Sequence, residues 1–225
     1  MISDVFLYLR LGFEHISDLK GYDHIVFIVA LCAVYSLRQW RNLLVLVTAF
    51  TIGHSATLAL ATLNILNVDS NLIEFLIPVT ILLTALMDLV EEGMFFRRDS
   101  TLRTEEHSAA APDNTNMKGT DSTVRHSRGW RAKYVLAMAF GLIHGLGFSN
   151  FLRAILGGEE SILIPLFSFN VGLEIGQLAI LLLVLTISMV IVLLPRVSQR
   201  NWAVFLSVVT GGIAVSMIIA RSANL

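Results

Sequence analysis

Long apolar segments with almost no charge dominate this chain and restrict the folds that it can adopt. Hydrophobic residues make up 55% of its 225 residues, and charged residues only 15%. About 20 apolar residues in a helix cross the ~30 Å hydrocarbon core of a bilayer. Only helices and closed barrels satisfy their backbone hydrogen bonds there, and apolar runs that are continuous rather than alternating favour helices. We therefore expect an all-α, polytopic membrane helix bundle that forms one domain over residues 1–225.

Six segments are predicted to be transmembrane helices. They are 23–37, 43–64, 72–92, 133–155, 161–194 and 202–220. Residues 1–20 place apolar side chains at helical spacing but also contain Asp4, Arg10 and Glu14, so we predict an interfacial helix rather than a signal peptide. Residues 97–132 are rich in Ser, Thr, Asp, Arg and Asn, and are predicted to form a polar loop.

Lys and Arg are distributed unevenly between the connections, which predicts the orientation of the chain. One side of the membrane would carry 12 of the 16 basic residues, most of them between 97 and 133. The other side would carry only Arg10, Lys20, Arg153 and Arg221. Because basic loops stay in the cytoplasm, we predict that the 97–132 loop is cytoplasmic. Both termini would then face the outer, periplasmic side of the inner cell membrane.

Four of the six histidines lie in or beside the apolar segments, together with carboxylate and amide residues. Ionisable groups at membrane depth are costly and usually face a protein interior or a wet cavity, where they mark a functional site. At a rise of ~1.5 Å per residue, the predicted spans bring these groups into one layer between the membrane midplane and its outer surface. The predicted metal ligands are His15, Asp23, His24, His54, His144 and Glu174. The predicted polar lining is Asp18, Ser55, Asn170 and Gln177.

Imidazole and carboxylate groups together indicate a particular kind of ion. They are the ligands of zinc, nickel, cobalt or iron rather than of Cu(I) or an iron–sulfur cluster. We therefore expect a divalent transition metal (nickel, cobalt or zinc) to bind. Cys32 is the single cysteine, which excludes an intrachain disulfide framework and a thiolate cluster. The expected partners are the lipid bilayer and a metal ion, with no nucleic acid, and the sequence is compatible with a homo-oligomer.

Each of these residues also has a purely structural interpretation. His54 alone could hydrogen-bond a neighbouring helix, and the glycines around His144 could serve only close helix packing. Asp18 and Glu14 could be solvated charges at the membrane interface. We favour a shared polar site because independent structural residues would not be expected to converge on one layer.

A short internal echo links two of the predicted hairpins. It pairs Ala49-Phe50-x-x-x-His54 with Ala139-Phe140-x-x-x-His144, and Leu76-Ile77-Pro78 with Leu163-Ile164-Pro165. Duplicated halves with Pro-containing helices occur in transporters. A duplicated two-helix hairpin would place two histidines symmetrically, and chance similarity in apolar sequence is the alternative.

Four sequence blocks carry most of these polar residues. They are Gly12-x-x-His15 followed by Gly21-x-Asp23-His24-x-x-Phe27; Thr48-Ala49-Phe50-Thr51-x-x-His54-Ser55-x-Thr57-Leu58; Phe140-Gly141-Leu142-x-His144-Gly145-x-Gly147-Phe148; and Phe169-Asn170-x-Gly172-x-Glu174-x-Gly176-Gln177. In this order they resemble the HupE/UreJ family of membrane proteins, and most closely its broader second branch. That family accompanies hydrogenase and urease genes and is regarded as a nickel or cobalt permease, so the resemblance implies uptake of a divalent metal.

Two functions remain open on the sequence alone. In a permease, a hydrated ion would enter at the outer mouth and lose water to the buried histidines. In a zinc-dependent intramembrane hydrolase, Glu174 or Asp23 would be the general base for attack on a lipid or a membrane-embedded peptide or acyl bond. The inner halves of the predicted helices are nearly apolar apart from Asp88 and Thr48, which counts against simple conduction. We favour a transporter over an enzyme.

Overall fold

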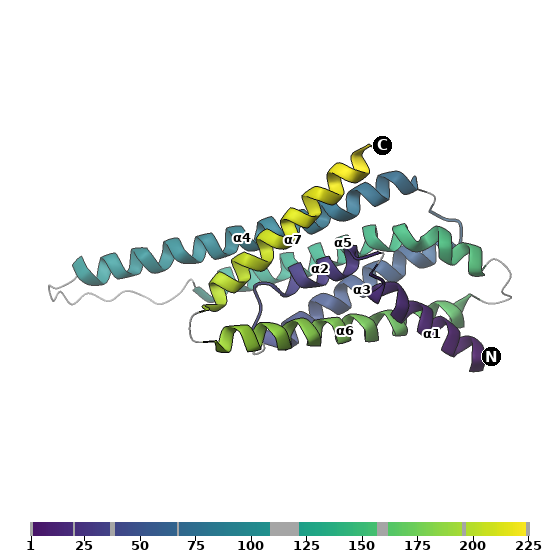
Figure 1. Ribbon diagram of the computed structural model, residues 1–225, viewed down its shortest axis with the longest axis horizontal. Helices are drawn as coiled ribbons and strands as arrows, with labels where there is room; N and C mark the ends of the chain where they lie inside the picture. The colour runs from purple at the N-terminus through teal and green to yellow at the C-terminus, as the bar shows by residue number, and fades with distance from the viewer. Residues whose placement is uncertain are drawn as a thin grey trace.

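The predicted all-α class is confirmed over the part of the chain that the structure describes. The computed structural model describes residues 2–19, 21–36, 39–66, 68–108, 122–156, 162–194 and 197–223. Within these ranges the regular secondary structure is helical throughout (Figure 1). The helices are α1 (Ile2–Ser17), α2 (Asp23–Cys32), α3 (Trp40–Thr62), α4 (Ser70–Ser108), α5 (Ser122–Leu156), α6 (Leu163–Leu193) and α7 (Gln199–Ser222).

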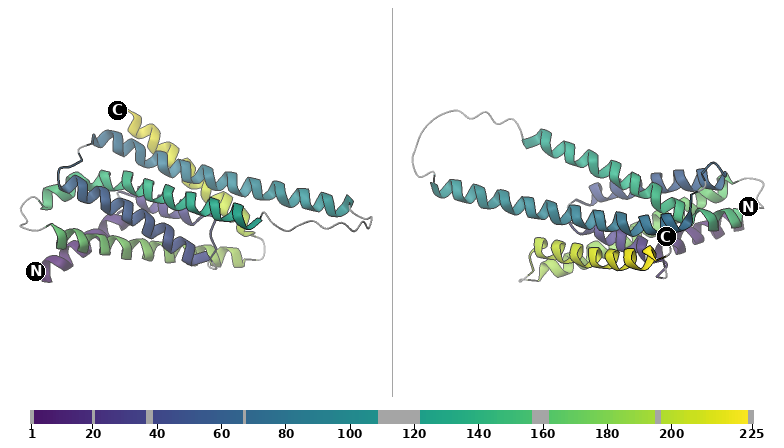
Figure 2. Two further views of the ribbon diagram at one scale, coloured as in Figure 1. Left: turned by 180° about the vertical axis from the view of Figure 1, so that it is seen from behind. Right: turned by 90° about the horizontal axis from the view of Figure 1, so that it is seen from above.

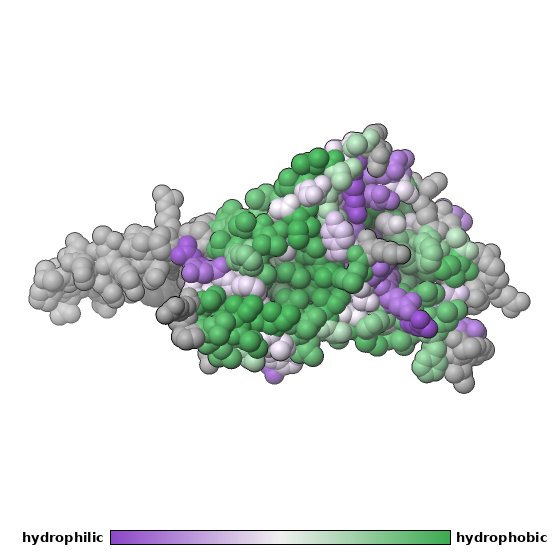
Figure 3. Space-filling model, viewed as in Figure 1, coloured by the Kyte–Doolittle hydropathy of each residue, from purple (hydrophilic) through white to green (hydrophobic). Residues whose placement is uncertain are grey.

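Four helices in the described ranges are long and apolar enough to cross a membrane. They are Trp40–Thr62, the Ser70–Glu91 part of α4, Leu163–Leu193 and Gln199–Ser222. Two further predicted spans appear as shorter apolar helices, Asp23–Cys32 and Lys133–Ser149. The ten residues of α2 cover about 15 Å, which is half of a hydrocarbon core. Figure 3 shows a band of hydrophobic residues across one face, with hydrophilic residues on either side.

The connection between the third and fourth predicted spans is shorter than the sequence suggested. The predicted loop covers 97–132, but α4 continues to Ser108 and α5 already begins at Ser122. Glu, Arg, Lys and Ala have good helix propensities, so a helix can continue beyond its apolar segment at little cost. Figure 2 shows α4 and α5 projecting beyond the other helices at the same end. The rest of the predicted loop, 109–121, lies outside the described residues.

Glycines bring α3 and α5 into direct backbone contact. A Cβ atom on Gly141 would overlap the carbonyl oxygen of Phe50, and one on Gly145 would overlap that of His54. From the other side, a Cβ on Gly53 would overlap the carbonyl oxygen of Met138. Small residues at a helix crossing let two backbones approach closely. The helices α3 and α5, which carry the two Ala-Phe-x-x-x-His segments, therefore pack directly against each other.

A second glycine crossing joins α1 to the first half of α6. A Cβ on Gly12 would overlap the carbonyl oxygen of Phe169, and one on Gly172 would overlap that of Leu9. The contact buries Tyr8 and Ile16 of α1 completely or nearly so. Residues 2–17 are helical, and α6 covers one side of this helix. Its position at the membrane interface stays a prediction.

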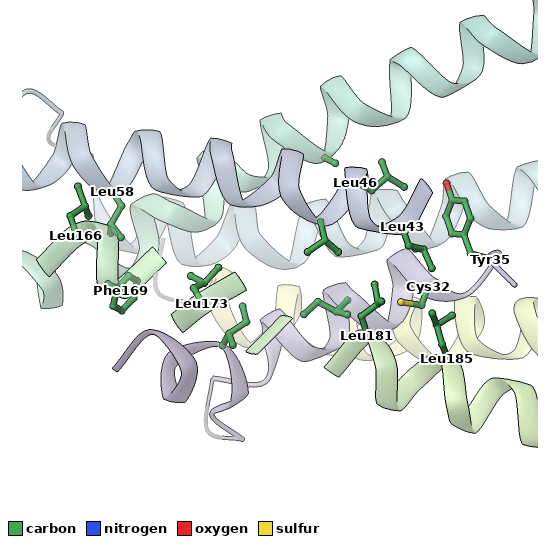
Figure 4. Close-up of a cluster of buried hydrophobic side chains, with 14 of the residues drawn as sticks. Cys32, Tyr35, Leu43, Leu46, Leu58, Leu166, Phe169, Leu173, Leu181 and Leu185 are labelled. Atoms are coloured by element: carbon green, nitrogen blue, oxygen red, sulfur yellow. The ribbon is translucent and has the colours of Figure 1, made fainter. Parts of the chain in front are cut away.

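Buried aliphatic side chains fill the space between α3 and α6. Figure 4 shows this cluster, with leucines of α3 facing leucines and a phenylalanine of α6. Its labelled members are Cys32, Tyr35, Leu43, Leu46, Leu58, Leu166, Phe169, Leu173, Leu181 and Leu185. A second cluster gathers Phe27, Phe50, Ile77, Ile81 and Phe140 from the neighbouring helices α2 to α5. His15 contacts Phe169 of the first cluster, and His144 contacts Phe27 and Phe50 of the second.

Gly141→Ala tests the α3–α5 crossing. The added methyl group must push the two backbones apart, and overpacking of this kind costs about 1–3 kcal/mol. We expect the apparent melting temperature of the purified protein in detergent to fall by roughly 2–10 °C. Gly212→Ala is the matched control, because a Cβ at Gly212 meets no other atom within 4 Å. Equal melting temperatures for the two variants would contradict the close crossing.

Candidate functional site

Four histidine rings from four helices lie together in the bundle. We call His15 of α1, His24 of α2, His54 of α3 and His144 of α5 the histidine cluster. The ring of His24 is central: its centroid lies 4.7 Å from that of His15, 5.2 Å from that of His144 and 6.0 Å from that of His54. The centroids of His15 and His54 are also 6.0 Å apart. These separations resemble those of imidazoles that share one ion, about 5 Å between ring centres for metal–nitrogen bonds of ~2.0–2.1 Å.

The histidine cluster is buried, and most of its nitrogens have no protein partner. His54 and His144 are 0% exposed and His24 is 5% exposed. Within the described ranges, no hydrogen-bond partner is found for His15 Nε2, His24 Nε2, His144 Nδ1 or either ring nitrogen of His54. A buried polar atom without a partner costs about 1–3 kcal/mol. Five such atoms in one place are therefore expensive unless a bound ion or water satisfies them.

Asp23 holds the ring of His24 in a defined orientation. Its Oδ1 atom accepts a hydrogen bond from the backbone N–H of His24 and lies 3.1 Å from His24 Nδ1. Its Oδ2 atom lies 3.2 Å from Nη2 of Arg221, and Nη1 of Arg221 donates to the carbonyl oxygen of Glu74. A carboxylate in this position places the imidazole proton on Nδ1 and leaves the lone pair on Nε2. Asp23 therefore orients a histidine, with both of its oxygens already engaged.

Thr80 of α4 does the same for His144. Its hydroxyl donates to the carbonyl oxygen of Ile77 at 2.6 Å and lies 3.1 Å from His144 Nε2. A hydroxyl has one proton to donate, so Thr80 Oγ1 must accept from His144 Nε2–H. The lone pair of His144 is then on Nδ1, the nitrogen without a partner. In two of the four histidines, neighbouring side chains thus leave the free nitrogen ready to bind a cation.

His15 lies where the histidine cluster meets the surface. Its ring packs on Phe148 with 3.8 Å between ring centroids. Burial holds the pKa of His15 below its ordinary value, and the adjacent rings of His24 and His54 lower it further, whereas Asp23 opposes the shift. His15 also lines a surface pocket with Glu14 and Asp18, which we call the α1 pocket. This pocket connects two acidic side chains with the edge of the histidine cluster.

The polar residues of α6 face α3 in a separate groove. Oε1 of Glu174 accepts a hydrogen bond from the Thr48 hydroxyl at 3.2 Å, and Oε1 of Gln177 accepts one from Thr51 at 2.7 Å. Glu174 lines this α3–α6 groove together with Asn170 and Ser55. The structure therefore gathers the four histidines and Asp23 at one place, and places Glu174, Asn170 and Ser55 beside it on the α6 side of α3.

No ready-made ion cage is present in the described ranges. No three His, Cys, Asp or Glu side chains are arranged there to hold a metal ion as they stand. The ring separations suit a shared ion, and binding one would require the imidazole rings to rotate. The arrangement can accept a divalent cation through neutral nitrogens. The carboxylate beside the rings, Asp23, has both oxygens engaged by His24 and Arg221.

Arg221 and Thr80 are site residues that the sequence analysis did not single out. Arg221 ends an otherwise apolar helix, and Thr80 follows two residues after Pro78 in a predicted span. A lone arginine close to the membrane, at the same predicted depth as Asp23, was the available signal for an ion pair. Thr80 carried no comparable signal, because threonines are common in apolar helices.

Fold and site together define a class: a helical membrane protein with a buried histidine cluster. A family model described as HupE / UreJ protein matches residues 1–101 and 116–221. The chain belongs to the HupE/UreJ family, as its sequence blocks predicted. This family is associated with nickel or cobalt uptake or accessory functions, and it is not an enzyme family. A search of curated proteins and a search of solved structures found no match.

Arg221→Met tests the ion pair that supports His24. Removing one partner leaves the carboxylate of Asp23 buried without its counter-charge, which costs 3–5 kcal/mol in a fully buried pair. Because Arg221 is 25% exposed, we expect about 2 kcal/mol and a lower melting temperature.

Two further variants control this measurement. Asp23→Asn added to Arg221→Met should recover part of the loss, since it removes the stranded charge. Arg10→Met breaks only an exposed pair with Glu14 and should change stability by less than about 1 kcal/mol. If Arg10→Met and Arg221→Met lower the melting temperature equally, the pair with Asp23 contributes no more than a surface contact.

Proposed function

We propose that the protein is a membrane permease for a divalent transition metal of the nickel or cobalt class. The observation that carries this proposal is the histidine cluster, with five buried ring nitrogens that have no partner among the described residues. The orientation of His24 by Asp23 and of His144 by Thr80 supports it, because each contact frees one nitrogen for a cation. The family supports the same function.

The α1 pocket is the proposed entrance. Glu14 and Asp18 line it next to His15, and carboxylates at a pocket mouth raise the local concentration of cations. A hydrated ion would reach His15 first and then exchange water for the nitrogens of His24, His54 and His144. Under the predicted orientation of the chain, this pocket opens on the periplasmic side.

The charge balance of the site suits transport better than storage. The Asp23 carboxylate is paired with Arg221, so the four neutral imidazoles provide most of the binding without adding net negative charge. Conduction requires sites that bind an ion strongly enough to dehydrate it and weakly enough to release it. Glu174 is a candidate for a later contact, since it lies in the adjacent groove with its carboxylate on Thr48.

Metal binding to the purified protein tests this function. We expect chelator-washed protein to bind Ni²⁺ or Co²⁺ reversibly in equilibrium dialysis. His54→Ala and His144→Ala should each weaken binding at least tenfold while the protein still inserts and elutes as a folded species. Thr80→Val keeps the shape of the side chain but removes the hydrogen bond to His144, and loss of such a supporting contact typically costs 10–100-fold in affinity.

Two results would count against the permease. His107→Ala, a histidine outside the apolar segments, is the control and should bind like the wild type; equal losses in all variants would show that binding is not at the cluster. Near-stoichiometric zinc that survives chelation and disappears in His144→Ala would indicate a tight site and favour the zinc-dependent hydrolase.

The pH dependence of binding follows from the burial of His15. Only neutral imidazole binds a metal, so binding should weaken as pH falls. Because the pKa of His15 is lowered, the neutral form persists below the ordinary histidine value of ~6.5, and we expect the midpoint of the loss below that value. Co²⁺ dialysis at a series of pH values measures it, with the elution profile checked at each pH. A midpoint above ~6.5 would contradict binding by a buried His15.

A further inference from the structure

Three phenylalanines close the histidine cluster on one side. Phe27 follows His24 by one helical turn, and Phe50 and Phe140 precede His54 and His144 by one turn. The rings of Phe27 and Phe50 stack at 4.8 Å between centroids, and Phe140 meets Phe27 edge-on at 6.2 Å. We call these three residues the aromatic layer; Phe27 and Phe50 each lie 5.2 Å from the ring of His144.

A pocket lies on the far side of the aromatic layer. Phe27 and Phe140 form part of its wall. On α2 and α5 the lining continues away from the histidines, with Leu31 after Phe27 and Ala137 before Phe140. This α4 pocket is also lined by Thr84 and Asp88 of α4 and by Lys133 of α5. Asp88 is only 7% exposed and lies near the end of the candidate span Ser70–Glu91, and a buried carboxylate within such a span is a candidate functional residue.

One face of α4 connects the histidine cluster with this pocket. Thr80, Thr84 and Asp88 follow i, i+4, i+8 spacing and therefore lie on one side of the helix. All three are buried, Thr80 contacts His144, and the other two line the pocket. At ~1.5 Å per residue, Asp88 is about 12 Å along the helix from Thr80. The polar side chains of α4 thus extend beyond the aromatic layer. The phenyl rings of that layer fill the direct path between the histidine cluster and the α4 pocket.

We propose that Asp88 is a second cation-binding residue, which receives a divalent ion from the histidine cluster along the Thr80–Thr84 face of α4. The proposal rests on the proposed permease function and adds the route by which the ion leaves the histidines. Lys133, which also lines the pocket, forms an ion pair with Glu91. The buried carboxylate of Asp88 would offset the charge of an ion after it has left the imidazoles.

The test separates binding from movement. Wild type, Asp88→Asn and Glu74→Gln are compared for Co²⁺ binding in detergent and for Co²⁺ uptake into proteoliposomes. We expect Asp88→Asn to bind Co²⁺ at the histidines within twofold of the wild type but to take it up at least tenfold more slowly. Glu74→Gln, which changes an exposed carboxylate near the other end of α4, should retain uptake within a few-fold. Wild-type rates for Asp88→Asn would overturn the second site.

A binding measurement tests the same residue without transport. His144→Ala should keep weaker Co²⁺ binding that falls at least tenfold further when Asp88→Asn is added, and equal binding by the single and double variants would overturn the proposal. Thr84→Val serves where Asp88→Asn fails to fold: it should slow uptake with unchanged binding at the histidines, and unchanged uptake would refute the α4 route. If the wild type itself takes up no Co²⁺, the permease function fails, and the weak site in His144→Ala still decides whether Asp88 binds cations.

Discussion

Backbone contact between α3 and α5 is the constraint on which the site depends. His54 and His144 project from helices that touch through Gly53, Gly141 and Gly145, and no larger residue would let them meet. The same crossing fixes Phe50 beside the two histidines, so the aromatic layer and the histidine cluster are positioned by one contact. α1 and α6 repeat the device with other glycines and bring His15 to the cluster from the opposite side. Four imidazoles are thus gathered by helix packing, without any loop.

Such a site is costly in the absence of an ion, and the cost is informative. Apolar packing around the rings excludes water, which raises the free energy of each nitrogen without a partner. A cation would recover that energy, yet the surrounding groups supply little net negative charge to hold it, since Asp23 is neutralised by Arg221. A cation held only by imidazole lone pairs would therefore have a short residence time in the cluster. The aromatic layer on one side and the acidic α1 pocket on the other make the two sides of the cluster unequal.

The sequence could predict that these polar residues share one level of the bundle, but not the direction in which each helix turns its side chains. Apolar runs and basic loops place His15, His24, His54 and His144 in one layer, and the structure puts their rings together. Glu174 has a similar predicted depth, but its carboxylate contacts Thr48 of α3. The rotation of α6 about its axis depends on its packing with α1, which the periodicity of α6 does not encode. Arg221 joins Asp23 across nearly the whole chain, and no local pattern encodes that pairing. The extensions of α4 and α5 are polar, and a polar sequence is typical of a loop as well as of an exposed helix, so the sequence alone does not predict them.

The ion pair between α2 and α7 has a consequence for biogenesis. Helices enter the membrane in the order in which they are synthesised, and α7 is the seventh in the chain. Until it docks, Asp23 lacks the guanidinium of Arg221, and the orientation of the His24 ring is not yet supported from both sides. A nascent chain that has made only α1 to α6 therefore holds all four histidines but an unfinished site. Under the proposed function, complete metal binding would wait until α7 has docked.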